Sequence, residues 1–235
     1  MVMSSRREFV VPLQLGDGGE QPGGGLWVRR FGRTERFAHW WTVVMLATAL
    51  LTGVAMGDDG GSGSPLAWMH AGSVVLIGVG LAAAFLFGNH RALVRSAPQL
   101  FRFDRRDAAW LGGLLRHPAD HGREPEWGMF NTGQKMLAWA ISASVAAVVV
   151  TGVQAWFAHT GEGGLHGAAV AMTAVLLSAH VFMAVVNPAT RPALTGMVFG
   201  RVPRSWAAEH HGEWLDDVDK SDRSGHDLSP TSGRP

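Results

Sequence analysis

The sequence has no cysteine and no tyrosine, and it carries little charge for its length. Without cysteine, the protein cannot contain disulfides, cysteine-ligated iron–sulfur clusters, thiolate-ligated haem or haem attached through a Cys-x-x-Cys-His motif. Charged residues make up 17% of the chain, whereas a soluble domain usually has about a quarter. The composition therefore points away from an ordinary soluble domain and leaves histidine as the main candidate metal ligand.

The apolar residues are gathered in four long blocks. The blocks cover about residues 37–56, 66–88, 136–157 and 165–186, and none of them contains Lys, Arg, Asp or Glu. About 20 helical residues are needed to cross the roughly 30 Å hydrocarbon core of a bilayer. The alternative is a set of buried helices in a soluble bundle, but these blocks are apolar on all sides. The pattern predicts an all-α, integral membrane four-helix bundle.

The basic residues indicate the orientation of this bundle. Segments 1–36, 89–135 and 187–235 together hold all 20 Lys and Arg residues. The other two connections contain no basic residue, but include Asp58, Asp59 and Glu162. With four spans, the three basic segments lie on one side, which the positive-inside rule makes cytoplasmic. Both termini are therefore predicted to be cytoplasmic.

The chain is predicted to contain one membrane domain between two disordered ends. The composition of residues 1–30 and 216–235 predicts disordered segments, which leaves residues 31–215 for the membrane domain. Between the second and third spans, Phe103–Leu115 has apolar residues at helical spacing. This stretch is predicted to form a short helix at the membrane surface.

Four of the 11 histidines lie within or at the ends of the predicted spans. His39 begins the first span, and His70 lies at the outer start of the second. His166 and His180 are 14 residues apart on the fourth span. Fourteen residues are almost four helical turns, so both rings face the same way, about 21 Å apart. The spacing pairs His70 with His166 at an outer level, and His39 with His180 at a cytoplasmic level.

Two stacked b haems explain these pairs, because haem iron takes two axial imidazoles from opposing helices. Zinc needs three or four converging ligands, and the Glu-x-x-His motif of di-iron sites is absent from the spans. Gly53 and Ala84 follow His39 and His70 by 14 residues, so each falls at the level of the other haem. A small residue there would let a porphyrin approach the backbone, and Gly53 is a candidate for haem packing.

Two other classes of function remain as alternatives. A passive membrane anchor would only dock a catalytic partner, and the intramembrane histidines argue against it because a polar ring at membrane depth is costly without a partner. A proton- or ion-conducting transporter would use the histidines as relays. The absence of acidic residues from the spans argues against that function.

Several motifs carry a family resemblance that covers about residues 31–215. The most specific are Arg36-Phe37-Ala38-His39-Trp40, Asn131-Thr132-Gly133-Gln134-Lys135-Met136, the His166–His180 spacing, and the runs at 187–194 and 200–207. In these motifs the sequence resembles the cytochrome b (gamma) subunit of membrane-bound formate dehydrogenases, a family of di-haem cytochromes b. The resemblance implies the same four haem ligands.

The resemblance also implies a site for menaquinone or another quinone beside the cytoplasmic haem. Asn131 and Gln134 carry over to this site, where amides would donate hydrogen bonds to a quinone carbonyl. The alternative for the motif is a helix N-terminus capped by Asn131, with Lys135 among the lipid headgroups. Phe130 stands where some relatives have an aromatic hydroxyl.

The resemblance further implies the partners and location of the chain. It would be the quinone-reducing electron-transfer subunit of a formate dehydrogenase complex in the bacterial cytoplasmic (inner) membrane. An iron–sulfur subunit would deliver electrons, and a molybdenum or tungsten subunit would oxidise formate, for which this chain has no site. Related cytochromes serve hydrogenases and thiosulfate or polysulfide reductases, so those donors remain alternatives. Membrane lipid is an expected contact, and nucleic acid is not.

Overall fold

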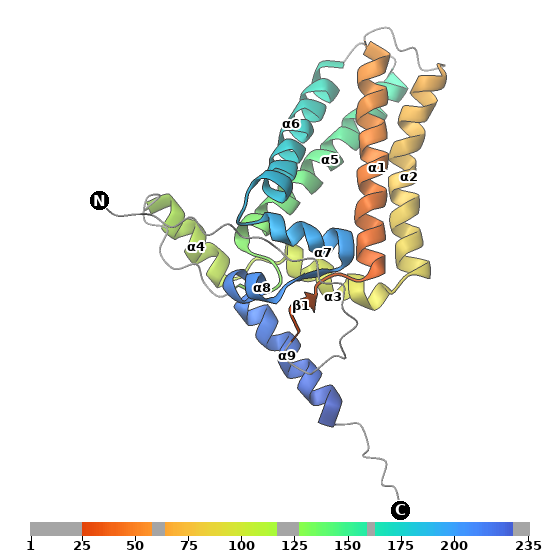
Figure 1. The fold of residues 1–235 in the computed structure, drawn as a ribbon. Coiled ribbons are helices and arrows are strands. Elements are labelled where there is room, and N and C mark those ends of the chain that lie inside the picture. The colour runs from red at the N-terminus through yellow and green to blue at the C-terminus, as the bar shows by residue number, and fades with distance from the viewer. Residues whose placement is uncertain (1–24, 58–63, 117–126, 159–162, 228–235) are drawn as a thin grey trace, which may run out of the picture.

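The structure is a computed structural model that describes residues 25–57, 64–116, 127–158 and 163–227 (Figure 1). Three acidic residues of the predicted outer connections, Asp58, Asp59 and Glu162, lie outside the described residues. The predicted disorder of residues 1–24 and 228–235 also falls outside them.

Four helices in the described part of the chain are long and apolar enough to cross a membrane. Three are α1 (Arg33–Met56), α2 (Pro65–Phe87) and α5 (Thr132–Ala158). The fourth is α6 (Gly163–Val181), which continues directly into the π-helix η2 (Phe182–Val186). These helices confirm the predicted all-α membrane fold and its four spans.

The long helices form two antiparallel hairpins, α1–α2 and α5–α6 (Figure 1). Within each hairpin the backbones are in contact along the helices, and no other pair of long helices in the described chain packs as extensively. Gly80 of α2 allows the first hairpin to close, because a Cβ there would overlap the indole of Trp41. The Trp41 indole N–H donates to the Leu76 carbonyl, 2.7 Å away. Side chains such as Val54 and Val175 point outward and are exposed, as lipid-facing residues are.

Two shorter helices connect the hairpins: α3 (His90–Phe101) and α4 (Arg105–Arg116). Helix α4 lies where the sequence predicts a helix, whereas α3 was not predicted. Pro98 lies inside α3, and the Trp139 indole N–H of α5 donates to the Phe101 carbonyl at 2.9 Å. This contact across the chain holds the end of α3 against the second hairpin.

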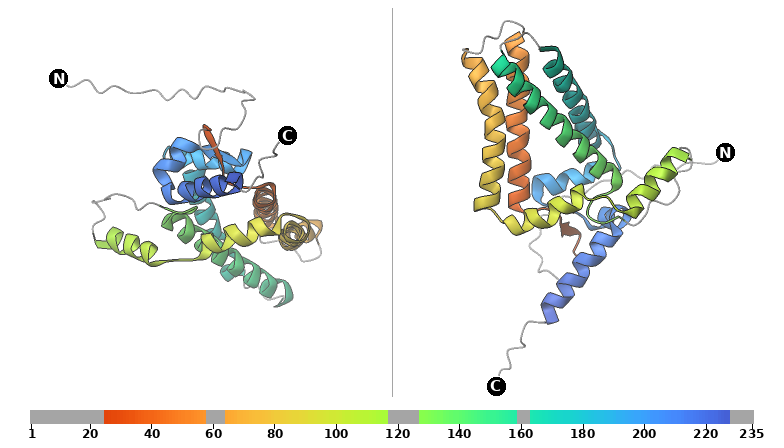
Figure 2. Two further views of the ribbon diagram at one scale, coloured as in Figure 1. Left: turned by 90° about the horizontal axis from the view of Figure 1, so that it is seen from below. Right: turned by 180° about the vertical axis from the view of Figure 1, so that it is seen from behind.

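The C-terminal part forms a cap beneath the hairpins (Figure 2). Its elements are η3 (Arg191–Ala193), α7 (Leu194–Phe199), β2 (Arg201–Pro203), α8 (Arg204–His210) and α9 (Gly212–Asp227). The N-terminal strand β1 (Trp27–Arg29) pairs antiparallel with β2. The core of the cap contains Val28, Val202, Trp206, Ala207 and Leu215.

This cap corrects two predictions of disorder. Residues 25–30 belong to β1 and its flanks, and residues 216–227 continue α9. Val28 is buried against the C-terminal core, and an Arg204–Asp219 ion pair joins α8 to α9. Composition predicts disorder for both segments, but β1 is ordered by pairing with β2, and α9 is ordered by packing and an ion pair within the C-terminal part.

Gly200 joins the cap to the start of the first span. It ends α7 in the left-handed conformation, with φ of 81°, which favours glycine. Its carbonyl accepts backbone N–H groups from Arg30 at 2.9 Å and Phe31 at 3.3 Å. A Cβ at this position would lie 2.8 Å from the Phe31 carbonyl oxygen. The turn therefore ties the segment before α1 to the C-terminal cap.

Candidate functional site

The four span histidines form two facing pairs, and each pair bridges the two hairpins. His39 of α1 faces His180 of α6, with ring centres 6.3 Å apart and planes inclined by 59°. His70 of α2 faces His166 of α6 at the same 6.3 Å, with planes inclined by 87°. The structure thus brings together the pairs that the sequence spacing predicts.

The tautomer of His70 leaves its second ring nitrogen free. Its Nδ1 lies 2.9 Å from the carbonyl oxygen of Ala49 on α1 and 3.3 Å from the Thr52 hydroxyl. A carbonyl only accepts, so Nδ1 carries the proton and Nε2 keeps its lone pair. This is the arrangement in which histidine binds a metal, with the other nitrogen fixed by a hydrogen bond.

His166 is held in the same way within the second hairpin. Its Nδ1 lies 3.1 Å from the hydroxyl of Thr151 on α5. That hydroxyl donates its single proton to the Ala147 carbonyl at 2.7 Å, so it accepts from the histidine. The Nε2 of His166 is therefore also left with a free lone pair.

A glycine next to each threonine makes room for these rings. A Cβ at Gly53 would lie 3.3 Å from Cε1 of His70, and a Cβ at Gly152 would lie 3.1 Å from Cε1 of His166. Gly53 was predicted to lie at the outer level, facing a porphyrin; the structure places it at that level, against the histidine ring. Ala84, the other small residue singled out, is buried.

The two threonines and Gly152 were missed by sequence reasoning, although the sequence carries a signal for them. Both spans that precede an outer histidine contain Thr-Gly-Val, at 52–54 and 151–153. On both α1 and α5, this repeat places a threonine hydroxyl, which can accept a hydrogen bond from a histidine, directly before a glycine.

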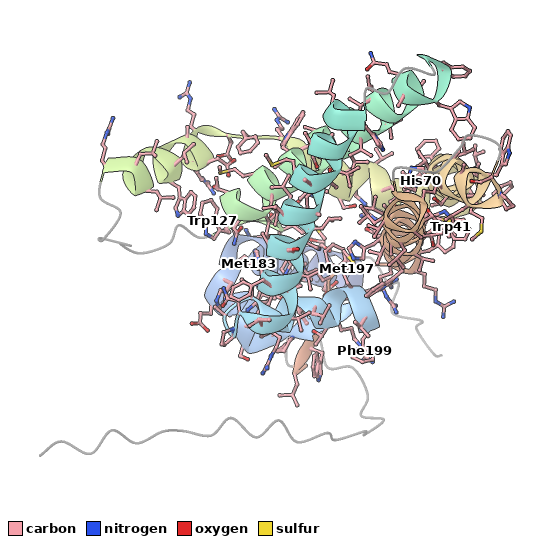
Figure 3. All side chains as sticks on the ribbon, turned by 90° about the horizontal axis from the view of Figure 1, so that it is seen from above. Trp41, His70, Trp127, Met183, Met197 and Phe199 are labelled. Carbon is pink, nitrogen blue, oxygen red and sulfur yellow. The ribbon has the colours of Figure 1, made fainter. Side chains whose placement is uncertain are left out.

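The start of α1, which carries His39, is fixed to the cap. Arg36 donates to the Met197 and Val198 carbonyls, and the Trp40 indole N–H donates to the Met197 carbonyl at 3.0 Å. In the view of Figure 3, Met197 of α7 projects between Met183 of η2 and Trp41 of the first hairpin. These contacts fix the position of His39 relative to the C-terminal cap.

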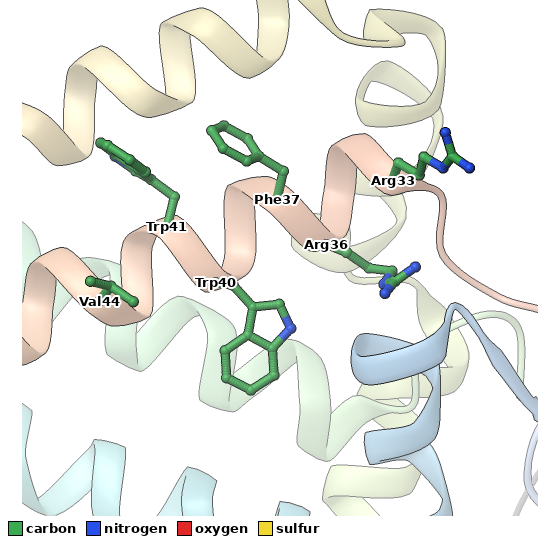
Figure 4. Close-up of a pocket in the computed structure, with 6 residues that line it drawn as sticks. All are labelled: Arg33, Arg36, Phe37, Trp40, Trp41 and Val44. Carbon is green, nitrogen blue, oxygen red and sulfur yellow. The ribbon is translucent and has the colours of Figure 1, made fainter.

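An open groove of about 610 Å³ runs along the same end of α1 (Figure 4). It is lined by Arg33, Arg36, Phe37, Trp40, Trp41 and Val44. Arginines at one end of an aromatic stripe are typical of a helix that passes from the headgroups into the bilayer. The groove is consistent with a lipid-facing surface.

Asn131 and Gln134 form a reciprocal cap at the start of α5. The Asn131 side-chain oxygen accepts from the Gln134 backbone N–H at 2.9 Å, and the Gln134 side-chain oxygen accepts from the Asn131 N–H at 3.2 Å. The helix-cap alternative is therefore part of the structure. Because both amide oxygens face the backbone, both NH₂ groups point elsewhere, and neither has a hydrogen-bond partner within the described residues.

A buried arginine before α1 was not anticipated. The Arg30 side chain donates from Nη2 to the Met129 carbonyl at 2.6 Å and lies 3.3 Å from Nε2 of His211. Four aromatic rings surround its guanidinium, with centroids 5.2 to 5.9 Å away: Phe31, Phe130, Trp206 and Trp214. Burial lowers the pKa of Arg30, but its guanidinium remains a cation at neutral pH.

His211 completes this cluster as a neutral ring. Its Nδ1 donates to the Gly128 carbonyl at 2.8 Å, which leaves Nε2 to accept from Arg30. Burial, together with the charge of Arg30, lowers the pKa of His211 to about 3. The pair fastens the segment before α5 to the cap, and so positions Asn131 from its N-terminal side.

A family model described as prokaryotic cytochrome b561 matches residues 30–200, which is most of the chain. The chain belongs to this family. The cytochrome is 23% identical over 208 residues to the nitrate-inducible formate dehydrogenase cytochrome b556(Fdn) subunit of Escherichia coli K12, covering 80% of this chain and 90% of the relative. It is 24% identical over 199 residues to the formate dehydrogenase cytochrome b556 subunit of Haemophilus influenzae, covering 76% and 78%.

A third similarity covers a shorter part of the chain. The formate dehydrogenase cytochrome b556(fdo) subunit of Escherichia coli K12 is 29% identical over 104 residues, or 40% of this chain and 48% of that relative. The family match and these relatives confirm the resemblance identified from the motifs. The protein is thus a member of a membrane electron-transfer family that carries haem b.

The histidine pairs of the cytochrome fit the haem b that its family implies. A metal–imidazole bond is about 2 Å long and the ring radius adds about 1 Å, so two axial imidazoles on one iron have centres about 6 Å apart. Both pairs have this separation, at 6.3 Å. No group of three or more His, Cys, Asp or Glu able to hold a metal occurs among the described residues.

Proposed function

We propose that this cytochrome holds two b haems, one between His39 and His180 and the other between His70 and His166. The equal ring separations, and the free Nε2 lone pairs of the two outer histidines, support this assignment. Each haem, when bound by its two histidines, would supply one-electron transfer rather than oxygen or substrate chemistry. The chain itself positions the imidazoles and, with Gly53, keeps space beside one of them.

We further propose that electrons pass from the outer level to the cytoplasmic level and then to menaquinone or another membrane quinone. Asn131 and Gln134 would bind the quinone carbonyl through their NH₂ groups, whose orientation the cap of α5 fixes. Amides can donate these hydrogen bonds without adding charge to the site. Protons would come from the cytoplasm, so that turnover charges the membrane.

The proposed electron donor is an iron–sulfur subunit of a formate dehydrogenase complex, with a molybdenum or tungsten subunit as the site of formate oxidation. The names of the relatives from Escherichia coli and Haemophilus influenzae support this donor. The positive-inside distribution of Lys and Arg supports an inner-membrane orientation with both termini in the cytoplasm.

Membranes that contain the full complex test this function. We expect formate to produce a reduced b-type spectrum, and added menadione to reoxidise it. Gln134→Ala should slow the reoxidation and leave the formate-driven reduction unchanged. Gln154→Ala is the matched control, because this exposed amide lies at the opposite end of α5 and makes no hydrogen bond within the described residues. Lack of reduction by formate contradicts the donor, and wild-type reoxidation in Gln134→Ala contradicts the quinone site.

A further inference from the structure

The first turn of α5 carries a buried ion pair as well as the two capping amides. Asp107 of α4 is only 1% exposed. Its Oδ1 accepts from the Thr132 hydroxyl at 2.6 Å, and its Oδ2 accepts from Lys135 Nζ at 2.7 Å and from the Asp104 backbone N–H at 2.8 Å. Thr132 and Lys135 alternate along the chain with the two amides of the proposed quinone site. A single helical turn therefore carries both the amides and the ion pair.

The carboxylate of this pair stays ionised. Burial acts to raise the pKa of Asp107, but hydrogen bonds from Lys135, Thr132 and the Asp104 backbone, together with the Lys135 charge, hold it below its ordinary value. Asp107 therefore carries no transferable proton at neutral pH. The exchangeable protons of the pair are those of the Lys135 ammonium group, which has three.

Lys135 also reaches an open cavity of about 420 Å³. This cavity lies between the end of α3, the start of α4, residues 127–130 and α9. Besides Lys135, its charged lining groups are Arg102, Asp104, Arg106, Glu213 and Asp217. Arg106 pairs with Glu213 at 2.5 Å, which links α4 to α9. Charged groups of both signs share the wall with aromatic side chains such as Trp127 and Trp214, and the charged groups give water in the cavity hydrogen-bond partners.

We infer that Lys135 is the proton donor for quinone reduction, and that the cavity supplies it with protons. The inference rests on the proposed quinone site at Asn131 and Gln134. Lys135 adjoins that site in the chain, and its side chain touches the cavity and the Asp107 carboxylate. It therefore joins a source of water to the turn of α5 that carries the two amides of the proposed quinone site.

Conversion of a quinone into a quinol takes two electrons, which arrive from the cytoplasmic haem level, and two protons. For each proton, an N–H bond of the Lys135 ammonium breaks and an O–H bond forms on a quinone oxygen, leaving a neutral amine. The amine and the Asp107 carboxylate then have a net negative charge, which draws a proton from the cytoplasm through water in the cavity and restores the ammonium.

The variant Lys135→Arg removes proton donation but keeps the positive charge and the packing of the side chain. Arginine can keep the ion pair with Asp107, but its guanidinium does not release a proton at accessible pH. The test uses the full haem-loaded chain in liposomes, reduced with dithionite and mixed with menadione between about pH 6 and about pH 9. The rate of haem reoxidation reports proton-coupled transfer, and quenching of tryptophan fluorescence in the oxidised protein reports menadione binding.

We expect Lys135→Arg to bind menadione within about twofold of wild type and to be reoxidised at least about tenfold more slowly, with the greatest loss at high pH. In Lys135→Ala, added methylammonium should restore part of the rate. Asp107→Asn keeps an acceptor for Thr132 but removes the negative charge, and should slow reoxidation most at high pH.

Two results would overturn proton donation by Lys135. One is a wild-type rate and pH profile in Lys135→Arg. The other is a loss of menadione affinity as large as the loss of rate, which would make Lys135 a positioning residue. Gln134→Ala tests the quinone site separately: unchanged menadione affinity in that variant places the quinone elsewhere, whatever the Lys135 variants show.

Discussion

The two outer histidines are oriented by the same local device, repeated on different helices. Each ring donates from Nδ1 toward an oxygen of the preceding long helix, and each lies against a glycine that follows a threonine. A hydrogen bond at Nδ1 fixes the ring and raises the basicity of Nε2. The threonines are therefore expected to tune the iron that the histidines bind, as well as to hold the rings.

Thr151→Val should raise the midpoint potential of the outer haem by about 40 mV, which corresponds to about 1 kcal/mol for one electron. The change removes the acceptor for His166 Nδ1, weakens Nε2 as a donor and so favours ferrous over ferric iron. Redox titration of the b-type absorbance measures the shift. Thr48→Val is the control, because that hydroxyl bonds to the Val44 carbonyl at 2.9 Å and to no histidine in the described structure. Equal titrations for the two variants would refute the role of Thr151.

Sequence spacing was sufficient to pair the four histidines, because the geometry of a helix determines which of its residues share a face. Two residues 14 positions apart share a face of a straight helix, so His166 and His180 had to lie at two levels of one surface. The hydrogen bonds to Thr52 and Thr151 depend on how the helices of each hairpin are rotated against each other. Spacing within one helix does not specify that rotation.

At the scale of elements, the spans and the cap differ in how far composition predicts them. A bilayer requires about 20 apolar residues, so the boundaries of the spans are visible in the sequence. Strand β1 is only three residues long and helix α9 is largely polar. Pairing with β2 orders β1, and α9 is ordered by the core that Leu215 shares with Val28 and Val202. Long-range contacts such as Val28 with the C-terminal core leave no local pattern, so these elements were predicted to be disordered.

The stability of the cap should depend on pH through His211. Its pKa in the folded state is about 3 against an ordinary 6.5, so between these values the unfolded state binds more protons. Stability is then fully present above about pH 6.5 and falls as the pH drops toward 3, by at most about 1.4 kcal/mol per pH unit. Tryptophan fluorescence during denaturation at several pH values measures this, since Trp206 and Trp214 adjoin His211.

His211→Gln removes the titrating ring and keeps a side chain that can accept from Arg30. We expect this variant to lose most of the pH dependence of the cap transition. A wild-type cap whose stability is the same at about pH 7 and about pH 4, or one that is more stable in acid, would contradict a buried neutral His211.

At the scale of the whole molecule, the two hairpins carry related but unequal sets of residues. Both have Thr-Gly-Val on the first helix and a histidine near the start of the second, yet α6 alone carries two histidines. The second hairpin thus contributes a ligand to each level, whereas in the first hairpin α1 and α2 contribute one each. This arrangement makes both proposed haems depend on contact between the hairpins.

The absence of native cysteine allows the orientation to be tested directly. Gly60→Cys places a thiol in the connection after α1, and Lys220→Cys places one on the exposed side of α9. In intact cells, we expect a membrane-impermeant maleimide to label Gly60→Cys and not Lys220→Cys. Lysed cells, in which both should react, provide the control. The reverse pattern in intact cells would contradict the predicted topology.

The central claim is that two pairs of histidines each bind one b haem, and the haem content of the purified chain tests it most directly. We predict two non-covalent haems per wild-type chain, and one in either His39→Ala or His166→Ala. His90→Ala, which changes a histidine at the start of α3 and outside both pairs, should keep two. Fewer than two haems in the wild-type chain, or two haems retained in both pair variants, would contradict the account.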